Sequence, residues 1–583
     1  MTTTTLARGG DWLLQDAEAI FTPEKLTDEH RLIARTADEF VRTEVLPALE
    51  RLEQKDWALA RELVKRCGDL GLLGTDVPEA FGGVALDKAA SILTGEAVGR
   101  AASFATTFGA QTGLAITPLL CFGTDDQQQR YLPGLVAGTT IGAYALSESG
   151  SGSDALGAKA RAARQPDGSF ILSGEKMWIT NGGFADLFIV FAQVDGEEFT
   201  AFIVERAFPG VSSGKEEHKL GLHGSSTTPL LLQDVRVPAA NVLGEIGRGH
   251  KVAFNVLNYG RFKLAAMCSG GAKAVIGEAA SYAAARRQFG QPIATFGAIR
   301  HKLAEMAIRG YAIESMLYRT TGLIDDAAHA GGGTREAVLA AFEEFAIEAS
   351  ILKVAASEML DYVLDENVQI HGGNGFVRDY PAERHYRDAR VNRIFEGTNE
   401  INRLLVPGML ARRAVKGGLP LIPAARRLQD ELLTPSVPEP PGDAALEAEG
   451  RTVAAMKKTA LMVLGTAMQT YGEKLAGEQE VLTLTADILI DVFAADSVVS
   501  RARASTTRSA ALQAAAATVF VNDAAGRVEL AARTALAAMA EGDMLRTLLA
   551  ALRRFMKVTP VNTVVLRRTI ADAVVASKGY PFP

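Results

Sequence analysis

The chain has 583 residues, which at about 150 residues per domain corresponds to roughly four domains or subdomains. It carries 61 basic and 68 acidic residues and no long run of Lys or Arg, so it lacks the basic footprint of a nucleic-acid-binding protein. No apolar stretch approaches the ~18 residues that a membrane helix needs. We therefore expect a soluble protein that binds no nucleic acid and associates with membranes weakly at most.

Cysteine usage and the N-terminus bear on the compartment. Cys67, Cys121 and Cys268 lie far apart, which predicts neither a disulfide framework nor a zinc site, and no pair or cluster of His residues indicates a catalytic metal. The first residues lack the apolar core of a secretory signal and contain only one early arginine. We expect a cytoplasmic protein with a short frayed leader over residues 1–26.

Residues 27–138 have helical periodicity. Apolar positions recur every three or four residues from Thr27 to Leu52, behind a threonine that is typical of a helix N-cap, and a second amphipathic pattern runs from Trp57 to Leu70. Gly and Pro residues in the segment 71–83 interrupt it. The first quarter of the chain is predicted to be a helical domain.

Short β-type runs replace this pattern over residues 139–245. Asp195 and Gly196 lie between two such runs and are typical of a type I′ hairpin turn. Connections this short cannot be the helical crossovers of a parallel sheet, so we expect a small antiparallel β domain.

Long helical patterns return at 250–284, 296–325 and 335–370, within a predicted helical bundle over residues 246–415. A Pro-rich linker at 434–443 then leads into Ala-rich helical sequence, and we expect residues 416–583 to form a C-terminal helical extension without chemistry of its own. The predicted fold class is mostly α with a small central antiparallel β domain.

Two short motifs match unrelated enzyme classes. Residues 150–155 fit the dinucleotide-binding pattern GxGxxA, and residues 210–214 fit the hydrolase pattern GxSxG. Hairpins rather than a βαβ unit follow the first motif, and the second has neither a strand before it nor a helix after it. Both are predicted to be turns.

Four other segments point to chemistry in combination. A Gly/Ser loop at 144–154 suits polar heterocycles and phosphates, and a strand at 176–183 carries Trp178, although alone these would be an ordinary turn and strand. Arg286 and Arg287 end a long helix, where they could clamp a pyrophosphate or only complement the helix dipole. Glu396 follows Phe395, and apolar neighbours would raise its pKa, as a general base acting on a weak carbon acid requires.

Together these segments resemble the acyl-CoA dehydrogenase family. Residues 145–154 and 369–393 are similar to its two signature patterns, with Ser149 in place of a common proline, and the C-terminal extension resembles the very-long-chain branch. The resemblance implies a helical N-terminal domain, a β domain and a helical bundle that carries the catalytic base, followed by a C-terminal helical domain. It also implies a homodimer with FAD bound between its subunits.

The resemblance assigns roles to individual residues. Those that would face the isoalloxazine ring are Tyr144, Leu146, Ser147, Trp178 and Thr180. Those that would reach the adenine and pyrophosphate half of the neighbouring subunit's FAD are Arg286, Gln288, Phe289, Gln369 and Gly373, while Thr398 and Glu400 lie beside the helix that follows the catalytic loop. Ser153 and Arg261 resemble coenzyme A contacts. Glu396 would be the base, because the position that carries it in some family members is Gly260 here.

The implied reaction is the first step of fatty acid β-oxidation. Glu396 would take the α-proton of a saturated fatty acyl-CoA while hydride leaves the β-carbon for the flavin, giving a trans-2-enoyl-CoA. Long acyl chains are the expected substrates, and an electron-transfer flavoprotein is the expected electron acceptor. The alternatives are an acyl-CoA oxidase that uses oxygen and a catalytically silent assembly protein on the same fold, although an intact Glu396 argues against the latter.

Overall fold

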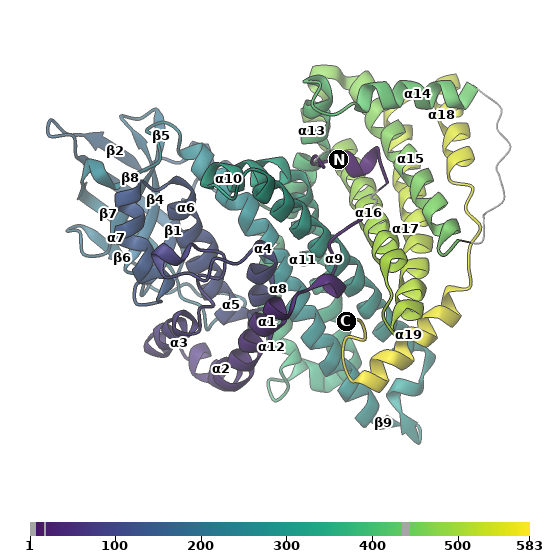
Figure 1. Cartoon of the computed structure of the whole chain (residues 1–583), viewed down its shortest axis with the longest axis horizontal. Coiled ribbons are helices and arrows are strands. Elements are labelled where there is room, and N and C mark those ends of the chain that lie inside the picture. Colours follow the sequence, from purple (N-terminus) through teal and green to yellow (C-terminus); the bar gives the residue numbers. More distant parts are fainter. Residues whose placement is uncertain (1–6, 17–18, 434–443) are drawn as a thin grey trace.

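The computed structural model describes residues 7–16, 19–433 and 444–583. Its parts follow the predicted order of helices, strands and helices, so the predicted fold class is confirmed. Figure 1 shows the N-terminal helices and the β domain on the left, the long helices of the bundle in the centre and the C-terminal helices on the right. The predicted Pro-rich linker at 434–443 lies outside the described residues.

The N-terminal part is helical, as the periodicity predicts, and its helices are α1 (Asp28–Phe40), α2 (Leu46–Glu53), α3 (Trp57–Asp69), α4 (Lys88–Val98), α5 (Ala102–Gly109), α6 (Thr117–Phe122) and α7 (Asp125–Val136). The hydroxyl of Thr27 caps α1 by accepting the N–H of His30. The single helix expected up to Leu52 is instead divided by a π-helical turn, Val41–Val45. Pro47 follows this turn, and because proline has no N–H it cannot continue the regular hydrogen-bond ladder.

The β domain contains one sheet, whose strands are β1 (Gly142–Ala145), β2 (Arg161–Arg164), β3 (Phe170–Thr180), β4 (Leu187–Val194), β5 (Glu198–Glu205), β6 (Val211–Ser213), β7 (Thr227–Val237) and β8 (Val242–Leu243). The order is β6-β7-β3-β2-β4-β5-β8, with β1 beside β4. Asp195 and Gly196 both have positive φ in the turn between β4 and β5, as a type I′ hairpin requires.

The sheet is not entirely antiparallel. β4 pairs in parallel with both β1 and β2. A parallel pair needs a long connection, and intervening strands rather than a helix supply it here. Short connections therefore predict the antiparallel pairing of strands that are neighbours in the chain, but not the pairing of strands that are further apart.

The bundle consists of α8 (Gly249–Ala285), α9 (Gly297–Ala330), α10 (Arg335–Glu344), α11 (Ala346–His371), α12 (Ala382–Ala389) and α13 (Asn399–Val415), with a hairpin of β9 (Arg287–Gln288) and β10 (Gln291–Pro292) between α8 and α9. The helix expected over 335–370 is two helices that meet at the buried Phe345.

The C-terminal helices are α14 (Leu421–Leu433), α15 (Glu447–Tyr471), α16 (Gln479–Ala504), α17 (Ala510–Met539), α18 (Gly542–Phe555) and α19 (Thr563–Ser577). Helix α16 packs on α9 and α13, and one hydrophobic core joins these helices to the bundle. A second core joins the N-terminal helices to the β domain. Within the described ranges, no helix combines the length and hydropathy needed to cross a bilayer.

The expectation of a frayed leader is wrong for the described part of residues 1–26. The side chain of Trp12 is only 4% exposed, and its indole N–H donates to Glu348 at 2.9 Å. Glu24 pairs with the buried Arg501 of α16. These polar anchors and the apolar burial of Trp12 fix the segment against the bundle and the C-terminal helices.

Candidate active site

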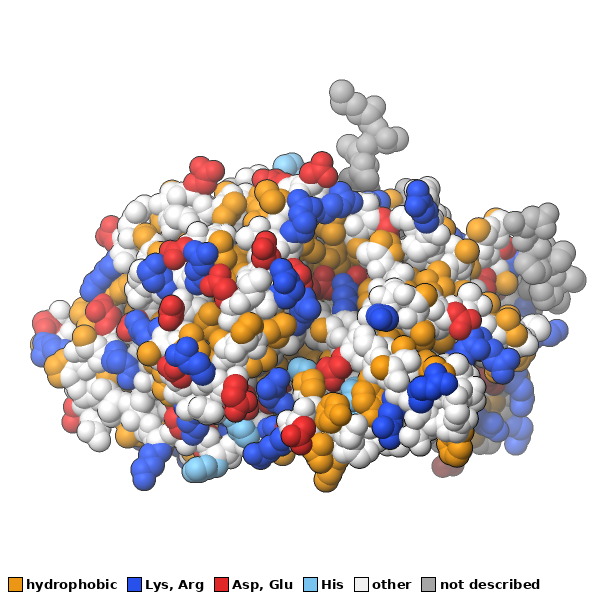
Figure 2. All heavy atoms as spheres, turned by 90° about the horizontal axis from the view of Figure 1, so that it is seen from below, with side chains coloured by type: hydrophobic (Ala, Val, Ile, Leu, Met, Phe, Trp, Pro, Cys, Tyr) orange, Lys and Arg blue, Asp and Glu red, His pale blue; other side chains and the backbone are white. Residues whose placement is uncertain are grey.

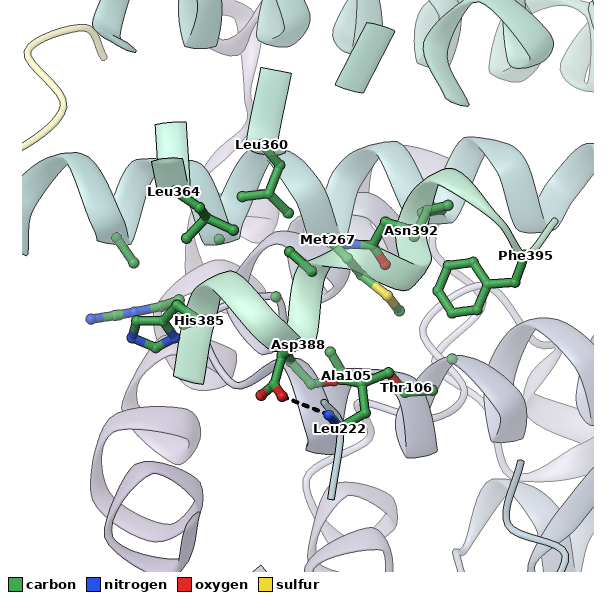
Figure 3. Close-up of a pocket in the computed structure, with 18 of the residues that line it drawn as sticks. Ala105, Thr106, Leu222, Met267, Leu360, Leu364, His385, Asp388, Asn392 and Phe395 are labelled. Carbon is green, nitrogen blue, oxygen red and sulfur yellow. Dashed lines mark hydrogen bonds between the residues drawn. The ribbon is translucent and has the colours of Figure 1, made fainter. Parts of the chain in front are cut away.

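A cavity of about 420 Å³ lies between the bundle and the N-terminal helices. Figure 3 shows Met267, Leu360 and Leu364 on one side of it, Ala105 and Thr106 on the other, and Phe395 at one end. Many wall positions are glycine or alanine, which leaves the space between the helices open. A loop of the β domain closes one flank, where the buried carboxylate of Asp388 accepts the N–H of Leu222 at 2.6 Å.

Glu396 lines this cavity from the loop before α13. Its φ is 58°, and Gly397 follows with φ 76°, so the sequence supplies glycine where the left-handed turn continues. Two side chains bind the loop backbone. The amide of Asn402 donates to the carbonyl oxygens of residues 396, 397 and 398, and Nε of Arg261 donates to that of Glu396 at 3.2 Å. The hydroxyl of Thr398 caps α13.

Burial raises the pKa of Glu396 to about 7, against the opposing effect of the nearby cations Arg261 and Lys353. Burial also lowers the pKa of Arg261 to about 10 and that of Lys353 to about 8. One carboxylate oxygen, Oε2, is buried without a hydrogen-bond partner among the described residues. A carboxylate in this setting is poised to accept a proton near neutral pH.

The structure brings the first two predicted motifs together. Tyr144 and Leu146 lie at and just after the end of β1, and the carbonyl of Ser147 accepts the N–H of Met177 on β3 at 2.9 Å. The Tyr144 hydroxyl is buried without a partner within the described ranges, and burial raises its pKa well above the usual value, with the charge of Glu396 adding to the effect. The strand that carries Tyr144 is therefore close to the base.

Trp178 is presented by an irregularity of the sheet. The register between β3 and β7 shifts between Lys176 and Ile179, and Trp178 has φ 59° with 56% of its surface exposed. A bulge of this kind re-aims a side chain that a regular strand would place elsewhere. Two residues further on, Thr180 lines the cavity. A large exposed aromatic ring thus lies near the cavity wall.

Glu148, the other carboxylate of the first motif, has a structural role. It accepts a hydrogen bond from the buried Lys176 Nζ at 2.7 Å and from the backbone N–H groups of Lys159 and Ala160. These bonds tie the Gly/Ser loop to the segment just before β2 and to β3. The neighbouring Ser153 is exposed on the same loop.

Arg261 does not lie on an open surface. It is 7% exposed, and Nη1 donates to Asn258 while Nε holds the loop of Glu396. Its contact with coenzyme A stays a prediction, whereas its contact with the base loop is observed.

The third motif lies at the far end of α8. Arg286 is the C-cap of the helix, Gln288 belongs to the exposed β9, and Phe289 is 92% exposed with φ 49°. From Gly260, beside the base, to Arg286 the helix rises over 26 residues, or about 39 Å at 1.5 Å per residue.

The fourth motif divides between these two places. Gln369 and Gly373 are exposed near the end of α11, and the ring of Tyr282 on α8 stacks on His371 with 4.0 Å between centroids. They therefore lie near the Arg286 end of α8, whereas Thr398 and the exposed Glu400 lie beside Glu396.

Sequence reasoning missed several residues of the site. Lys353 on α11 and Asn402 on α13 act on Glu396 and its loop, and no motif marks either of them. Gly109 and Gly113 line the cavity four residues apart, a spacing that the sequence displays and that could have indicated an open helix face. In the described part of the chain, no cluster of three or more His, Cys, Asp or Glu could hold a metal ion.

Known protein families match most of the chain. Family models described as the N-terminal, middle and C-terminal domains of acyl-CoA dehydrogenase match residues 27–139, 143–235 and 247–410, and a further C-terminal domain model matches residues 455–554. A protein of Bacillus subtilis (strain 168) described as "Probable acyl-CoA dehydrogenase" is 47% identical over 98% of both chains. The human very long-chain specific acyl-CoA dehydrogenase is 40% identical over 62% of this chain and 53% of its own length.

Among solved structures, an acyl-CoA dehydrogenase from Bacillus anthracis complexed with FAD has a TM-score of 0.97 at 46% identity, covering 98% of this chain and 100% of that one. The butyryl-CoA dehydrogenase of Megasphaera elsdenii has a TM-score of 0.61 at 37% identity, covering 66% of this chain and 99% of that one. The family models, the relatives and the solved structures all indicate the same family, and the chain belongs to the acyl-CoA dehydrogenase family.

Proposed function

We propose that this protein is an FAD-dependent dehydrogenase that converts saturated long-chain fatty acyl-CoA to trans-2-enoyl-CoA, the first step of β-oxidation. The observation that carries the proposal is the buried Oε2 of Glu396, which lies on the wall of a long cavity and has no hydrogen-bond partner in the part of the chain that the structure describes. An electron-transfer flavoprotein is the proposed electron acceptor.

The residues present fit FAD. The buried Tyr144 hydroxyl has no partner within the described residues, and the exposed Trp178 ring offers an aromatic face. We assign Tyr144, Leu146, Ser147, Trp178 and Thr180 to the isoalloxazine half. When bound, FAD would accept the hydride that leaves the substrate β-carbon.

Glu396 would remove the proton from the substrate α-carbon. Its pKa of about 7 leaves much of it ionised at neutral pH while keeping it basic enough for a carbon acid. Arg261 and Asn402 hold the loop backbone, so the carboxylate needs little reorganisation. The backbone N–H of Glu396 would donate to the thioester oxygen as negative charge develops there. Apolar walls would keep water away from the reacting atoms.

The length of the cavity supports long acyl chains as substrates. Its lining on α8 runs from Gly260 to Glu278, 18 residues or about 27 Å. An extended chain advances roughly 1.25 Å per carbon for a 1.5 Å bond, so about 20 carbons could lie along this wall. Gly271 and Ala274 keep the far half open.

The distance along α8 supports a homodimer with shared FAD. Arg286, Gln288, Phe289, Gln369 and Gly373 would bind the adenine and pyrophosphate half of the FAD in the partner subunit, because the site beside Glu396 is about 39 Å away along α8. Phe289 and Phe376 are 92% and 85% exposed, as expected of residues that a partner covers. Figure 2 views the molecule from the end that carries β9 and shows apolar side chains exposed among Lys and Arg.

The test is anaerobic titration of the purified holoenzyme with acyl-CoAs from 4 to about 20 carbons, followed by flavin bleaching. Bleaching by long chains supports the proposal, and no bleaching by any acyl-CoA contradicts it. An Ala274→Phe variant should lose bleaching by long chains and keep it for butanoyl-CoA. Rapid reoxidation in air would instead indicate an oxidase.

A further inference from the structure

The end of the chain folds back against the bundle. In Figure 1 the C-terminus lies in the middle of the molecule, near α9 and α19. The rings of Phe582 and Tyr311 on α9 are 4.6 Å apart, and a β-carbon placed on Gly310 would lie 3.2 Å from the ring of Tyr580. A β-carbon on Gly277 of α8 would lie 3.1 Å from the carbonyl oxygen of Lys578. We name residues 578–583 the tail.

A largely buried ionic network joins the tail to four helices. The Tyr580 hydroxyl donates to Glu314 of α9 at 2.9 Å. Lys273 of α8 bridges Glu314, at 2.5 Å, and Glu96 of α4, at 2.7 Å. Arg501 of α16 binds the same Glu314 carboxylate at 2.6 Å. Glu314 and Arg501 are buried and Lys273 and Tyr580 are partly buried, so the charges depend on one another for solvation.

The network contacts α8 on the side opposite the cavity. Gly271, Ala274 and Val275 line the cavity. Successive residues of a helix are 100° apart, so Lys273 points about 160° away from both Gly271 and Val275. Gly277 faces the same side as Lys273. On α4, Glu96 lies one turn before Gly99, which also lines the cavity. We name Gly271, Ala274 and Val275 the distal wall of the cavity. The tail therefore supports this distal wall from the opposite side of α8.

An open cavity needs such support. Vacant apolar volume in a protein is unfavourable, and neighbouring elements relax inward where they can. On α8 the distal wall includes Gly271 and Ala274, which add little bulk to keep the helices apart. The position of α8 must therefore be fixed from outside the cavity, and the network that includes Tyr580 and Glu314 joins α8 to α4 and α9 there.

We propose that the tail braces the distal acyl cavity, so that the C-terminal extension determines the capacity for long acyl chains. The inference rests on the proposed dehydrogenation and deepens it, because it assigns part of the substrate selectivity to residues that do not touch the substrate. Tyr580 is thus a positioning residue.

The first test compares Tyr580→Phe with Tyr471→Phe in the holoenzyme. Both remove one hydroxyl from the C-terminal part, but the Tyr471 hydroxyl donates to the carbonyl of Ala538 on an exposed surface. We expect Tyr580→Phe to lower kcat/KM for hexadecanoyl-CoA at least about fivefold, as loss of a hydrogen bond to a charged group allows, and to leave butanoyl-CoA within about twofold. Tyr471→Phe should change neither. An equal loss for both chain lengths, or no loss, would overturn the proposal.

The second test is hydrogen exchange of the α8 amides over residues 267–278, with Phe582→Ala as a stronger variant. We expect faster exchange there in both tail variants and unchanged exchange near Gly260. Exchange that is unchanged, or faster throughout the protein, would overturn the brace. A wild-type protein that oxidises no acyl-CoA would contradict the proposed function alone, since the exchange experiment needs no turnover.

Discussion

A β-carbon placed on Gly260 would lie 2.6 Å from Oε2 and 2.9 Å from Cδ of Glu396. The carboxylate therefore occupies the space that a side chain on α8 would take. In sequence, Gly260 is the position that carries the base in some members of the family that this chain resembles. One volume can hold a carboxylate from α8 or from the loop before α13, and here the loop supplies it.

Gly260→Ala tests this relationship. The added methyl group should displace the Glu396 carboxylate, so the rate of flavin reduction should fall at least tenfold while FAD stays bound. Glycine inside a helix is less favourable than alanine by about 1 kcal/mol, so the melting temperature should hold or rise. Stopped-flow reduction and thermal unfolding measure the two effects. Gly113→Ala is the control, because Gly113 also lines the cavity but has nothing within 4 Å of its β-carbon position.

Glu396→Gln should keep FAD and acyl-CoA binding and lose 10²–10⁴-fold or more in flavin reduction, because the amide cannot accept the proton. Glu148→Gln is the matched carboxylate control. It weakens the pairing with Lys176 and the two backbone bonds, so it should cost about 1.5–3 kcal/mol in stability and leave reduction comparatively unaffected. Reduction of Glu396→Gln near the wild-type rate would show that another group removes the proton.

Flavin reduction should rise with pH through about 7, because Glu396 must be ionised to act as the base. Lys353→Met removes a cation that lowers the pKa of Glu396, so the midpoint of the profile should move to higher pH. Rates measured from pH 5.5 to 9 decide this. A flat profile, or a midpoint that moves down, would contradict the assignment.

The same shift affects stability. The pKa of Glu396 is raised from 4.5 to about 7 in the folded protein. Its contribution to the free energy of unfolding is therefore fully present below pH 4.5 and is lost as pH rises through 7. The loss approaches about 3 kcal/mol. Glu396→Gln removes this dependence, and its melting temperature relative to wild type should be higher at pH 8 than at pH 5. The opposite order would mean that burial does not raise the pKa of the Glu396 carboxyl group.

Arg286→Ala should release FAD and weaken the dimer together, since loss of a charge-assisted contact with a phosphate costs about 1.5–3 kcal/mol. Arg287→Ala is the adjacent control, because Arg287 donates to the carbonyl of Gly290 within its own hairpin. Flavin content and light scattering of both variants provide the measurement. Equal flavin in the two variants and the wild type would remove Arg286 from the cofactor site, and a stable wild-type tetramer would contradict the dimer.

Local sequence determined much of the fold. The N-cap of Thr27, the turn at Asp195 and Gly196 and the long periodic helices are read from neighbouring residues, because capping, positive φ and amphipathic burial are short-range requirements. Phe395 beside Glu396 likewise predicted a raised pKa, although the burial that raises it comes from the surrounding cavity.

Only the tertiary structure decided which distant residues meet. Lys353 and Arg261 lie 43 and 135 positions before Glu396, yet both set its pKa, since electrostatic effects depend on separation in space. The parallel pairing of β1 with β4, the buried leader residue Trp12 and the contact of Tyr580 with Glu314 depend likewise on long-range packing. The sequence determined the chemistry of each group, and the fold determined its surroundings, because burial and charge act across helices that no local pattern connects.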